Sequence, residues 1–434
     1  MAEIKPIRPW RYNTQKGLEI SNLSAPLFDV VSDEQRENLY SDPFNSIHLS
    51  VPKGENPSLS ASKTLDKWKK EGMILQDNLP AIYVYYQYFS LSGSPKEYCR
   101  KGFICNIKIH EWHEKVILRH ESTMPFSVKD RLSILEKTEL NVSPTHGLYT
   151  DAQKEIESYL DESIKSPLYE TEDYQGVRDV MSVIHDSTII QRIQQIILDK
   201  QIILADGHHR YESSLIHMQE RRSSNPLHNG NEGYNYHLMY FTNTESEDLR
   251  ILPTHRLVKN VENFSKEDLL HSLSEYFDVK QIENVSDINE IIQGKKWTFG
   301  LLAENQAYRI SLKKDKFDTI SWNFPDQIKQ LDLTVMHYFV FEKILNIKGK
   351  KQTESNNISF ERNFAKCVSQ VITGKEQFAL ITKDISIEDV KQTCYSGYTM
   401  PQKSTYFYPK VISGFLFSSI KEDEFYSPFD TCFK

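Results

Sequence analysis

The sequence predicts a mixed α/β fold, in which a large domain is followed by a smaller α+β domain. Three observations lead to this prediction. First, two segments rich in aromatic and β-branched residues flank a turn. Second, apolar residues at helical spacing lead into an apolar strand. Third, the order of the predicted helices and strands changes after about residue 260. Hydrophobic residues make up 39% of the 434 residues and charged residues 26%, which is sufficient for a packed core.

Residues 1–260 are expected to form the larger domain. Prolines spaced along its first 60 residues predict loops and short strands there. The segments AIYVYYQYF from Ala81 and RKGFICNIKI from Arg100 predict a β-hairpin. A helix is predicted over residues 127–139, capped by Ser127, and another over residues 187–200, where isoleucines recur at helical spacing.

Residues 261–434 are expected to form the smaller domain. A helix capped by Ser265 leads into two strands, and the apolar segment LTVMHYFVFEKIL predicts a further helix. An α/β stretch then ends near YFYPK, whose Lys410 fits a strand end as well as a substrate site. The boundary is therefore expected near residue 260.

Composition restricts the classes of partner and the compartment. The net charge of -8 disfavours sequence-blind binding to nucleic acid. The five cysteines have no CxxC spacing, which favours free thiols in a reducing compartment. The N-terminus has no apolar segment typical of a signal peptide, and no apolar run approaches the length of a membrane span. We therefore expect a cytoplasmic protein with a small-molecule substrate.

The segment ILADGHHRYESSL, residues 203–215, has the features of a phosphate-binding turn. An apolar strand is expected to end at the turn DGHH, with a helix from Tyr211. Gly207 would let a ligand approach the main chain, and the first amides of a helix attract anions. Arg210 offers a bidentate fork for phosphate oxygens, and His208 and His209 add hydrogen-bond donors or a general acid or base.

The residues alone leave other interpretations of this segment open. Asp206 and Gly207 also suit a plain strand-to-helix turn in which the histidines have no function. A metal site is disfavoured, since adjacent histidines in a turn point apart and no third ligand stands at a recognised spacing. No metal is therefore predicted.

Other polar residues are weaker candidates. Asp29, in SAPLFDV, could activate a hydroxyl or simply form a turn. His120 and Glu121 form an acid/base pair after a predicted strand. Lys129 and Arg131 are basic residues at a predicted helix start, and His255 and Arg256 follow the apolar run of ILPTHRLV. A structural role is also open for each of these six residues.

The chain resembles a large prokaryotic family catalogued as domain of unknown function 1015. The matching segments run from one end to the other: PIRPWRYN from Pro6, SAPLFDVVS from Ser24, HEST from His120, KDRLSILEKTELNVSPTHGLY from Lys129, ADGHHRYESSL from Ala205, YNYHLMYFTN from Tyr234, ILPTHRLV from Ile251 and MPQKSTYFYPKVISG from Met400. The box DGHHR is also similar to the GxxR phosphate box of the ParB/sulfiredoxin superfamily, in the form found in free serine kinases.

This resemblance implies a ParB/sulfiredoxin-like domain over residues 1–260 that binds phosphate or nucleotide. The sequence departs from the family at Leu27 and Phe28, where a proline and a tyrosine are usual, and at Ser122, where a basic residue is common. A role for that tyrosine hydroxyl is therefore in doubt. His146 stands where phenylalanine is common, and we interpret it as a packing residue.

The resemblance implies phosphoryl transfer on free serine or phosphoserine, either as a kinase or as a phosphatase of serine synthesis. Phosphate would be held by Gly207, His208, His209 and Arg210, and a carboxylate or His209 would transfer the proton. The carboxylate candidates are Asp29, Glu121 and Asp206; the expected substrate contacts are His120, Lys129, Arg131, His255 and Arg256. ADP or ATP with Mg²⁺ is expected if a nucleotide takes part. The alternative is a nucleotide-binding regulatory protein without turnover, and a homodimer is left open.

Overall fold

A computed structural model describes residues 1–26, 33–91, 94–173, 175–349, 351–354, 356–401 and 403–425. The chain divides into two compact units, and each is described by itself. Unit 1 comprises residues 1–119, 123–249 and 409–434, and unit 2 comprises residues 120–122 and 250–408. The expected linear division at residue 260 differs from this one, because the C-terminal segment pairs with unit 1.

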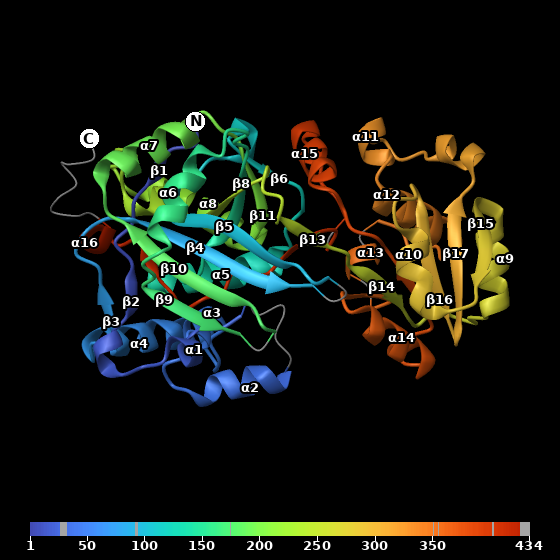
Figure 1. The fold of residues 1–434 in the computed structure, drawn as a ribbon, viewed down its shortest axis with the longest axis horizontal. Coiled ribbons are helices and arrows are strands. Elements are labelled where there is room, and N and C mark those ends of the chain that lie inside the picture. The colour runs from blue at the N-terminus through green and yellow to red at the C-terminus, as the bar shows by residue number, and fades with distance from the viewer. Residues whose placement is uncertain are drawn as a thin grey trace. The chain divides into compact units, whose positions relative to one another are not determined.

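Unit 1 is built on a nine-stranded mixed sheet (Figure 1). The order is β6-β11-β8-β12-β5-β4-β10-β9, and β1 pairs with β5. The strands are β1 (Ile4–Lys5), β4 (Ile82–Ser90), β5 (Glu97–Lys108), β6 (Ile117–Arg119), β8 (Thr145–Tyr149), β9 (Tyr169–Glu172), β10 (Arg178–Ile184), β11 (Ile202–Asp206) and β12 (Tyr236–Asn243). The expected hairpin is confirmed as β4 and β5, which pair antiparallel from Tyr83↔Ile104 to Ser90↔Glu97.

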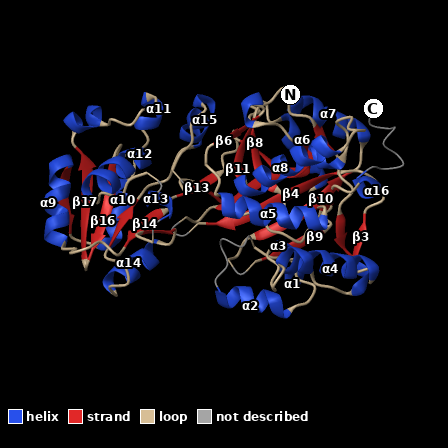
Figure 2. Ribbon diagram, turned by 180° about the vertical axis from the view of Figure 1, so that it is seen from behind, coloured by secondary structure: helices blue, strands red, loops and turns tan. Residues whose placement is uncertain are grey.

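Helices cover one face of this sheet and an extended C-terminal segment covers the other. Helices α6 (Glu155–Ser163), α7 (Ser187–Leu198) and α8 (His208–Ser224) bury their apolar residues against alternate residues of β4 and β5. The intervening residues of these strands, including Tyr83 and Tyr85, pack on Val411, Ile412, Phe415 and Leu416. The sheet is thus buried on both faces, by α6, α7 and α8 on one of them (Figure 2) and by residues 411–416 on the other.

The N-terminal residues form a third layer with α5 (Pro125–Thr138). Helix α4 (Pro57–Lys70) packs on α5, which in turn packs on α8. Helix α5 begins two residues before the expected start, with Pro125 in its first turn and Met124 as the N-cap in place of Ser127. The fixed φ of proline and its missing N–H suit that position.

Unit 2 is built on a six-stranded antiparallel sheet with the order β15-β17-β16-β19-β14-β18. The strands are β14 (His255–Val258), β15 (Phe277–Ile282), β16 (Thr298–Ala303), β17 (Gln306–Leu312), β18 (Ile358–Glu361) and β19 (Phe378–Ile381). Helices α9 (Lys266–Tyr276) and α12 (Asp332–Met336) with the π-helix His337–Ile344 cover one face. Helices α10 (Ile288–Ile292) and α14 (Phe364–Ile372) cover the other.

The expected mixed α/β class is confirmed. The remaining elements are short: β2 (Trp10–Tyr12), α1 (Ile20–Leu23), α2 (Asp33–Ser41), α3 (Ile47–Ser50), β3 (Ile74–Gln76), β7 (Leu140–Asn141), β13 (Arg250–Leu252), α11 (Asp326–Lys329), α13 (Lys351–Glu354), α15 (Ile387–Ser396), β20 (Tyr406–Tyr408), β21 (Ser418–Ser419), α16 (Glu422–Phe425) and several 3₁₀ turns. The segment ILPTHRLV contributes to two strands, because Pro253 separates β13 from β14.

Candidate functional site

The turn between β11 and α8 forms the core of the candidate site. Strand β11 ends at Asp206, Gly207 adopts φ 87° and ψ 28°, and α8 begins at His208. The expected start at Tyr211 is therefore three residues late, because a glycine in the left-handed region lets the helix begin at once. Arg210 thus lies in the first turn, four residues after Asp206 and on the same side of the helix.

Two cations bind the Asp206 carboxylate. Arg210 Nη2 donates to Asp206 Oδ2 at 3.0 Å, and Lys410 Nζ binds Oδ1. The three side chains are 16%, 20% and 10% exposed for Arg210, Asp206 and Lys410. Burial raises the pKa of Asp206, but Lys410 and then Arg210 outweigh it and hold that pKa well below its usual range. Two cations on one carboxylate leave the cluster with one net positive charge.

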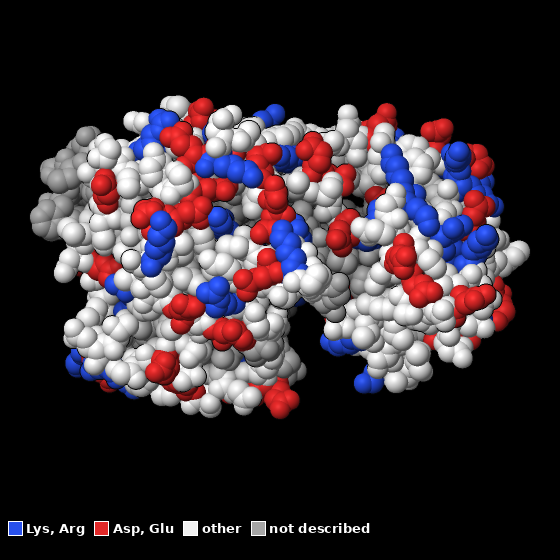
Figure 3. All heavy atoms as spheres, in the orientation of Figure 1, with Lys and Arg blue, Asp and Glu red and all other residues white. Residues whose placement is uncertain are grey.

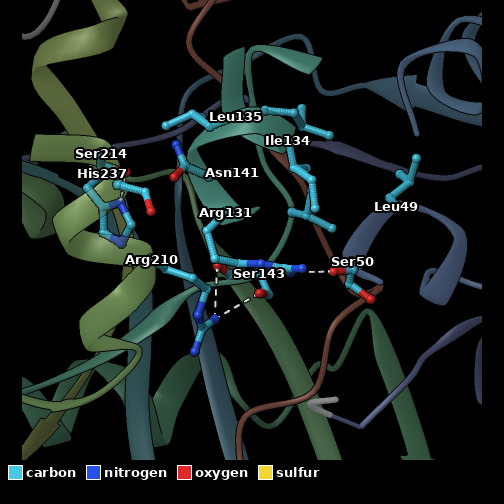
Figure 4. A pocket seen from close by; sticks show the side chains of 13 residues that line it. Leu49, Ser50, Arg131, Ile134, Leu135, Asn141, Ser143, Arg210, Ser214 and His237 are labelled. Carbon is cyan, nitrogen blue, oxygen red and sulfur yellow. Dashed lines mark hydrogen bonds between the residues drawn. The ribbon is translucent and has the colours of Figure 1, made fainter. Parts of the chain in front are cut away.

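A small cavity of about 50 Å³ lies beside Arg210 (Figure 4). Arg210 Nη1 donates to Ser143 Oγ and to Pro144 O, both at 2.8 Å, which fixes the guanidinium at the cavity wall. Arg131 from α5 lines the same cavity and donates to Ser50 O. A single water requires about 10–15 Å³, so the cavity has room for a phosphoryl group and is too small for a nucleoside.

A buried histidine completes the cavity wall. His237 Nδ1 lies 2.8 Å from Ser214 Oγ, and His237 Nε2 lies 3.0 Å from Thr145 Oγ1. Burial and the nearby Arg210 charge lower the pKa of His237 to about 3. The ring is therefore neutral at pH 7, and it orients two hydroxyls.

The histidines of the box differ in exposure. His208 is buried at the start of α8, whereas His209 is partly exposed. The amide of Met124 donates to His209 Nε2 at 3.0 Å. In this arrangement Nε2 supplies the lone pair and the ring proton sits on Nδ1.

Of the predicted residues that the structure describes, only Arg131 lines the cavity together with Arg210. Gly207, His208 and His209 do not line it. Lys129 is exposed on α5. Asp29 lies outside the described residues. His120, Glu121, His255 and Arg256 belong to unit 2 and are described within that unit.

In unit 2 the histidine and arginine of ILPTHRLV follow the strand β13, as expected, but they also lie inside the next strand, β14. His255 and Arg256 are 2% and 0% exposed. Their burial follows from Pro253, which ends β13 and places both residues in a central strand. His120 is also buried, and its Nε2 lies 2.7 Å from Thr405 Oγ1. Burial lowers the pKa of Arg256 to about 9, and the charge of Glu121 offsets part of this shift.

A row of buried polar residues crosses the sheet of unit 1 beneath Lys410. Gln87 stands between Asp179 and Arg100 in the strand register. Its amide nitrogen donates to Asp179 Oδ1 at 2.8 Å and to Lys410 O at 3.0 Å, and its oxygen accepts from Arg100 Nη2. Among the described residues, Asp179 Oδ2 and Arg100 Nε and Nη1 have no hydrogen-bond partner. Burial raises the pKa of Asp179 to about 7, against the hydrogen bonds from Tyr85 and Gln87.

Sequence reasoning missed Ser143, His237 and Gln87 and left Lys410 undecided. Lys410 follows Asp206 by 204 residues, so no local spacing joins them. His237 lies in the fully buried strand β12, so the sequence does not set it apart from its neighbours. His146 stacks on Tyr240 at 5.3 Å, which agrees with its interpretation as a packing residue.

Gly207→Ala is expected to lower the free energy of unfolding by about 2 kcal/mol more than Gly230→Ala does. A Cβ at Gly207 would lie 2.6 Å from Thr145 Cγ2 and 2.8 Å from Arg210 Nη2. Gly230 has a similar φ of 89° but nothing within 4 Å, so its substitution reports backbone strain alone. Urea denaturation of both variants measures the difference, and equal losses would contradict the tight packing of the turn.

On the face drawn in Figure 3, basic and acidic side chains are intermixed over each unit. Within the described ranges, no group of three or more His, Cys, Asp or Glu residues could hold a metal ion. None of the helices in those ranges has the length and apolarity needed to span a membrane.

Comparison with solved structures finds distant likenesses. A conserved hypothetical protein from Pyrococcus furiosus is 11% identical, with 72% of this chain and 94% of that chain covered and a TM-score of 0.36. A free serine kinase in complex with AMP is 11% identical, with 72% and 91% covered and a TM-score of 0.37. SbnI with a C-terminal truncation, from Staphylococcus aureus, is 12% identical, with 71% and 85% covered and a TM-score of 0.34. Likenesses at this level carry no conclusion about activity.

Comparison with curated proteins finds no match. A family model, in contrast, matches most of the chain, over residues 4–334. The chain therefore belongs to the family described as "Protein of unknown function (DUF1015)".

Proposed function

We propose that this protein catalyses phosphoryl transfer to or from free serine, with the phosphoryl group held at the turn between β11 and α8. The observation that carries the proposal is the convergence of Arg210 and Lys410 on Asp206 at a helix N-terminus, beside a cavity of phosphoryl size. A net positive charge and helix amides together favour a phosphate dianion. The similarity of DGHHR to the box of free serine kinases supports serine as the substrate.

In this proposal Arg210 and Lys410 neutralise phosphate oxygens, and Asp206 positions both cations. Phosphoryl transfer depends mainly on positioning and charge stabilisation, which this arrangement supplies. The lowered pKa of Asp206 makes it a weak base. His209 is not available as a base through Nε2 either, because this nitrogen accepts a hydrogen bond from the amide of Met124. We therefore expect the proton of the nucleophile to pass to a carboxylate outside this cluster.

The chemistry is a displacement at phosphorus. The serine hydroxyl oxygen forms the new P–O bond, the bond to the leaving oxygen breaks, and the hydroxyl proton passes to the carboxylate. Phosphoserine hydrolysis is the corresponding reaction with water as the nucleophile. A nucleotide would place its transferred phosphoryl group at Arg210 and its nucleoside outside the cavity, which is too small for it. Mg²⁺ would be held chiefly by phosphate oxygens, because Asp206 already binds two cations.

Turnover assays test the proposal. Purified protein is incubated with phosphoserine, with phosphoserine and ADP, and with serine and ATP, each with Mg²⁺, and products are followed by phosphorus NMR. We expect turnover in at least one mixture. Folded protein that turns over none of them contradicts the proposal, and nucleotide binding without turnover would favour the regulatory alternative.

Arg210→Ala is expected to lower kcat/KM by at least about 100-fold, because it removes a charge that faces the transferred group. The matched control is Arg221→Ala, which lies in the last turn of the same helix and is 52% exposed. The control is expected to keep its activity, and circular dichroism verifies that both variants are folded. A similar loss of activity in both variants would contradict the role of Arg210.

A further inference from the structure

The small cavity beside Arg210 is lined by both apolar and polar side chains. Ile134, Leu135, Leu140 and Val142 supply apolar surface. These side chains offer a ligand no hydrogen bonds, and they lower the local polarity, which strengthens any hydrogen bond made there. The polar side chains of the wall therefore decide which group is bound.

Most polar side chains of this wall are already engaged with the protein. Ser213 Oγ donates to a main-chain oxygen at 2.7 Å. Ser214 Oγ lies 2.8 Å from His237 Nδ1. The guanidinium of Arg131 donates to Asp130 and to a main-chain oxygen. These groups build the wall and have little capacity left for a ligand.

Asn141 differs from these residues. It lines the cavity together with Arg131 and Arg210 (Figure 4), and it is 7% exposed. Its main chain pairs with Ser418 between β7 and β21, but its side-chain amide makes no hydrogen bond with any described residue. Buried amides are ordinarily hydrogen-bonded, so an amide without a partner in a cavity wall indicates contact with a ligand.

Ser143 offers a second donor two residues further along the chain. It also lines the cavity, and it is 8% exposed. Its Oγ accepts from Arg210 Nη1 at 2.8 Å, which uses a lone pair and leaves the hydroxyl proton. Among the described residues this proton has no acceptor. Asn141 and Ser143 therefore bring two unused neutral donors to one cavity.

The nearby charge decides which side of the Asn141 amide faces a ligand. The amide carries both a donor and an acceptor, and no described residue holds either of them. Arg210 and Lys410 share the single negative charge of Asp206, so the field beside the cavity attracts an anion. The N–H groups of Asn141 then face the anion, and hydrogen bonds to a charged oxygen are stronger than those between neutral groups.

We propose that Asn141 Nδ2 and Ser143 Oγ donate hydrogen bonds to oxygens of a phosphoryl group bound beside Arg210. The inference rests on the proposed function and adds two residues that contact its phosphoryl group. The guanidinium of Arg210 supplies charge, and the two neutral donors fix the orientation of the group.

Titration calorimetry of the full-length protein with inorganic phosphate tests these contacts without any need for turnover. Asn141→Ala and Ser143→Ala are each expected to weaken phosphate binding at least about tenfold, because each removes a hydrogen bond to a charged oxygen. Asn141→Asp keeps the shape of the side chain but adds a negative charge, and its loss of affinity is expected to be larger, about 100-fold. The controls are Asn305→Ala and Asn305→Asp, in the exposed turn between β16 and β17, which are expected to keep the wild-type affinity.

Asn141→Ala is expected to keep the wild-type midpoint of urea unfolding, because its amide makes no hydrogen bond within the described chain. Phosphate affinity that is unchanged in both Asn141→Ala and Asn141→Asp overturns the inference, as does a wild-type protein that binds no phosphate at millimolar concentration. The turnover assays decide the proposed function separately. Phosphate binding that depends on Asn141 supports the inference even where no mixture is turned over, and turnover with unchanged kcat and KM in Asn141→Ala refutes the inference alone.

Discussion

Lys410→Met is expected to lower the free energy of unfolding by about 3 kcal/mol at pH 7 and to abolish phosphoryl transfer. Lys410 is 10% exposed and binds a carboxylate that is 20% exposed. Removal of one partner from a buried ion pair typically costs about 3–5 kcal/mol, and Arg210 keeps the loss near the lower end. The remaining cluster is neutral, so its attraction for phosphate falls.

The effect of Lys410→Met depends on pH in a defined direction. The pKa of Asp206 is lowered in the folded protein, so its stabilisation is present above the unfolded pKa of about 3.9. It is lost as the pH falls through the lowered folded pKa. The difference between wild type and variant is therefore largest at neutral pH and shrinks below about pH 4.

Urea denaturation at pH 7 and at acidic pH measures this difference. Lys165→Met is the control, because Lys165 and its partner Glu162 are 67% and 76% exposed and such pairs contribute about 0–1 kcal/mol. The double variant with Asp206→Asn should lose less than the sum of the single losses. Strict additivity would contradict the coupling of Lys410 with Asp206.

Asp179→Asn is expected to raise the free energy of unfolding by about 3–4 kcal/mol at pH 8. Burial raises the folded pKa of Asp179 to about 7, while its unfolded pKa is near 3.9. As the pH rises from about 4 to 7, the unfolded chain ionises here and the folded protein does not, so stability is lost over this window. Asparagine cannot ionise, and its Oδ1 can still accept from Tyr85 and Gln87.

Denaturation over the range from pH 4 to pH 8 measures this gain. The two proteins should have similar stability at pH 4 and diverge as the pH rises. Asp199→Asn serves as the control, because Asp199 is 79% exposed and surface substitutions usually change stability by less than about 0.5 kcal/mol. A variant that is less stable than wild type at pH 8 would show that the Asp179 charge stabilises buried Arg100.

The local sequence pattern was sufficient to predict much of the secondary structure. The aromatic alternation of β4 and β5 and the isoleucine spacing of α7 reflect the periods of strand and helix directly. Boundaries were less accurate, at α5, α8 and β14, because a proline or a glycine decides where an element begins. The return of residues 409–416 to unit 1 has no local signal at all.

The residues of the candidate site also fall into a predictable group and an unpredictable one. Gly207 and Arg210 were predictable, since a strand, a glycine and a helix start occupy consecutive residues. Ser143, His237 and Lys410 reach the turn from other segments, and their distances in sequence from Arg210 carry no information about contact.

The sequence by itself determined the mixed α/β class, the family and the strand–turn–helix of the box, because each depends on residues that are neighbours in the chain. Only the tertiary structure decided the electrostatic state of the box. It joins Lys410 to Asp206 across 204 residues and turns a candidate base into an ion-paired carboxylate. The physical reason is that burial and charge pairing arise from contacts between distant segments, and these set the pKa values on which the chemistry depends.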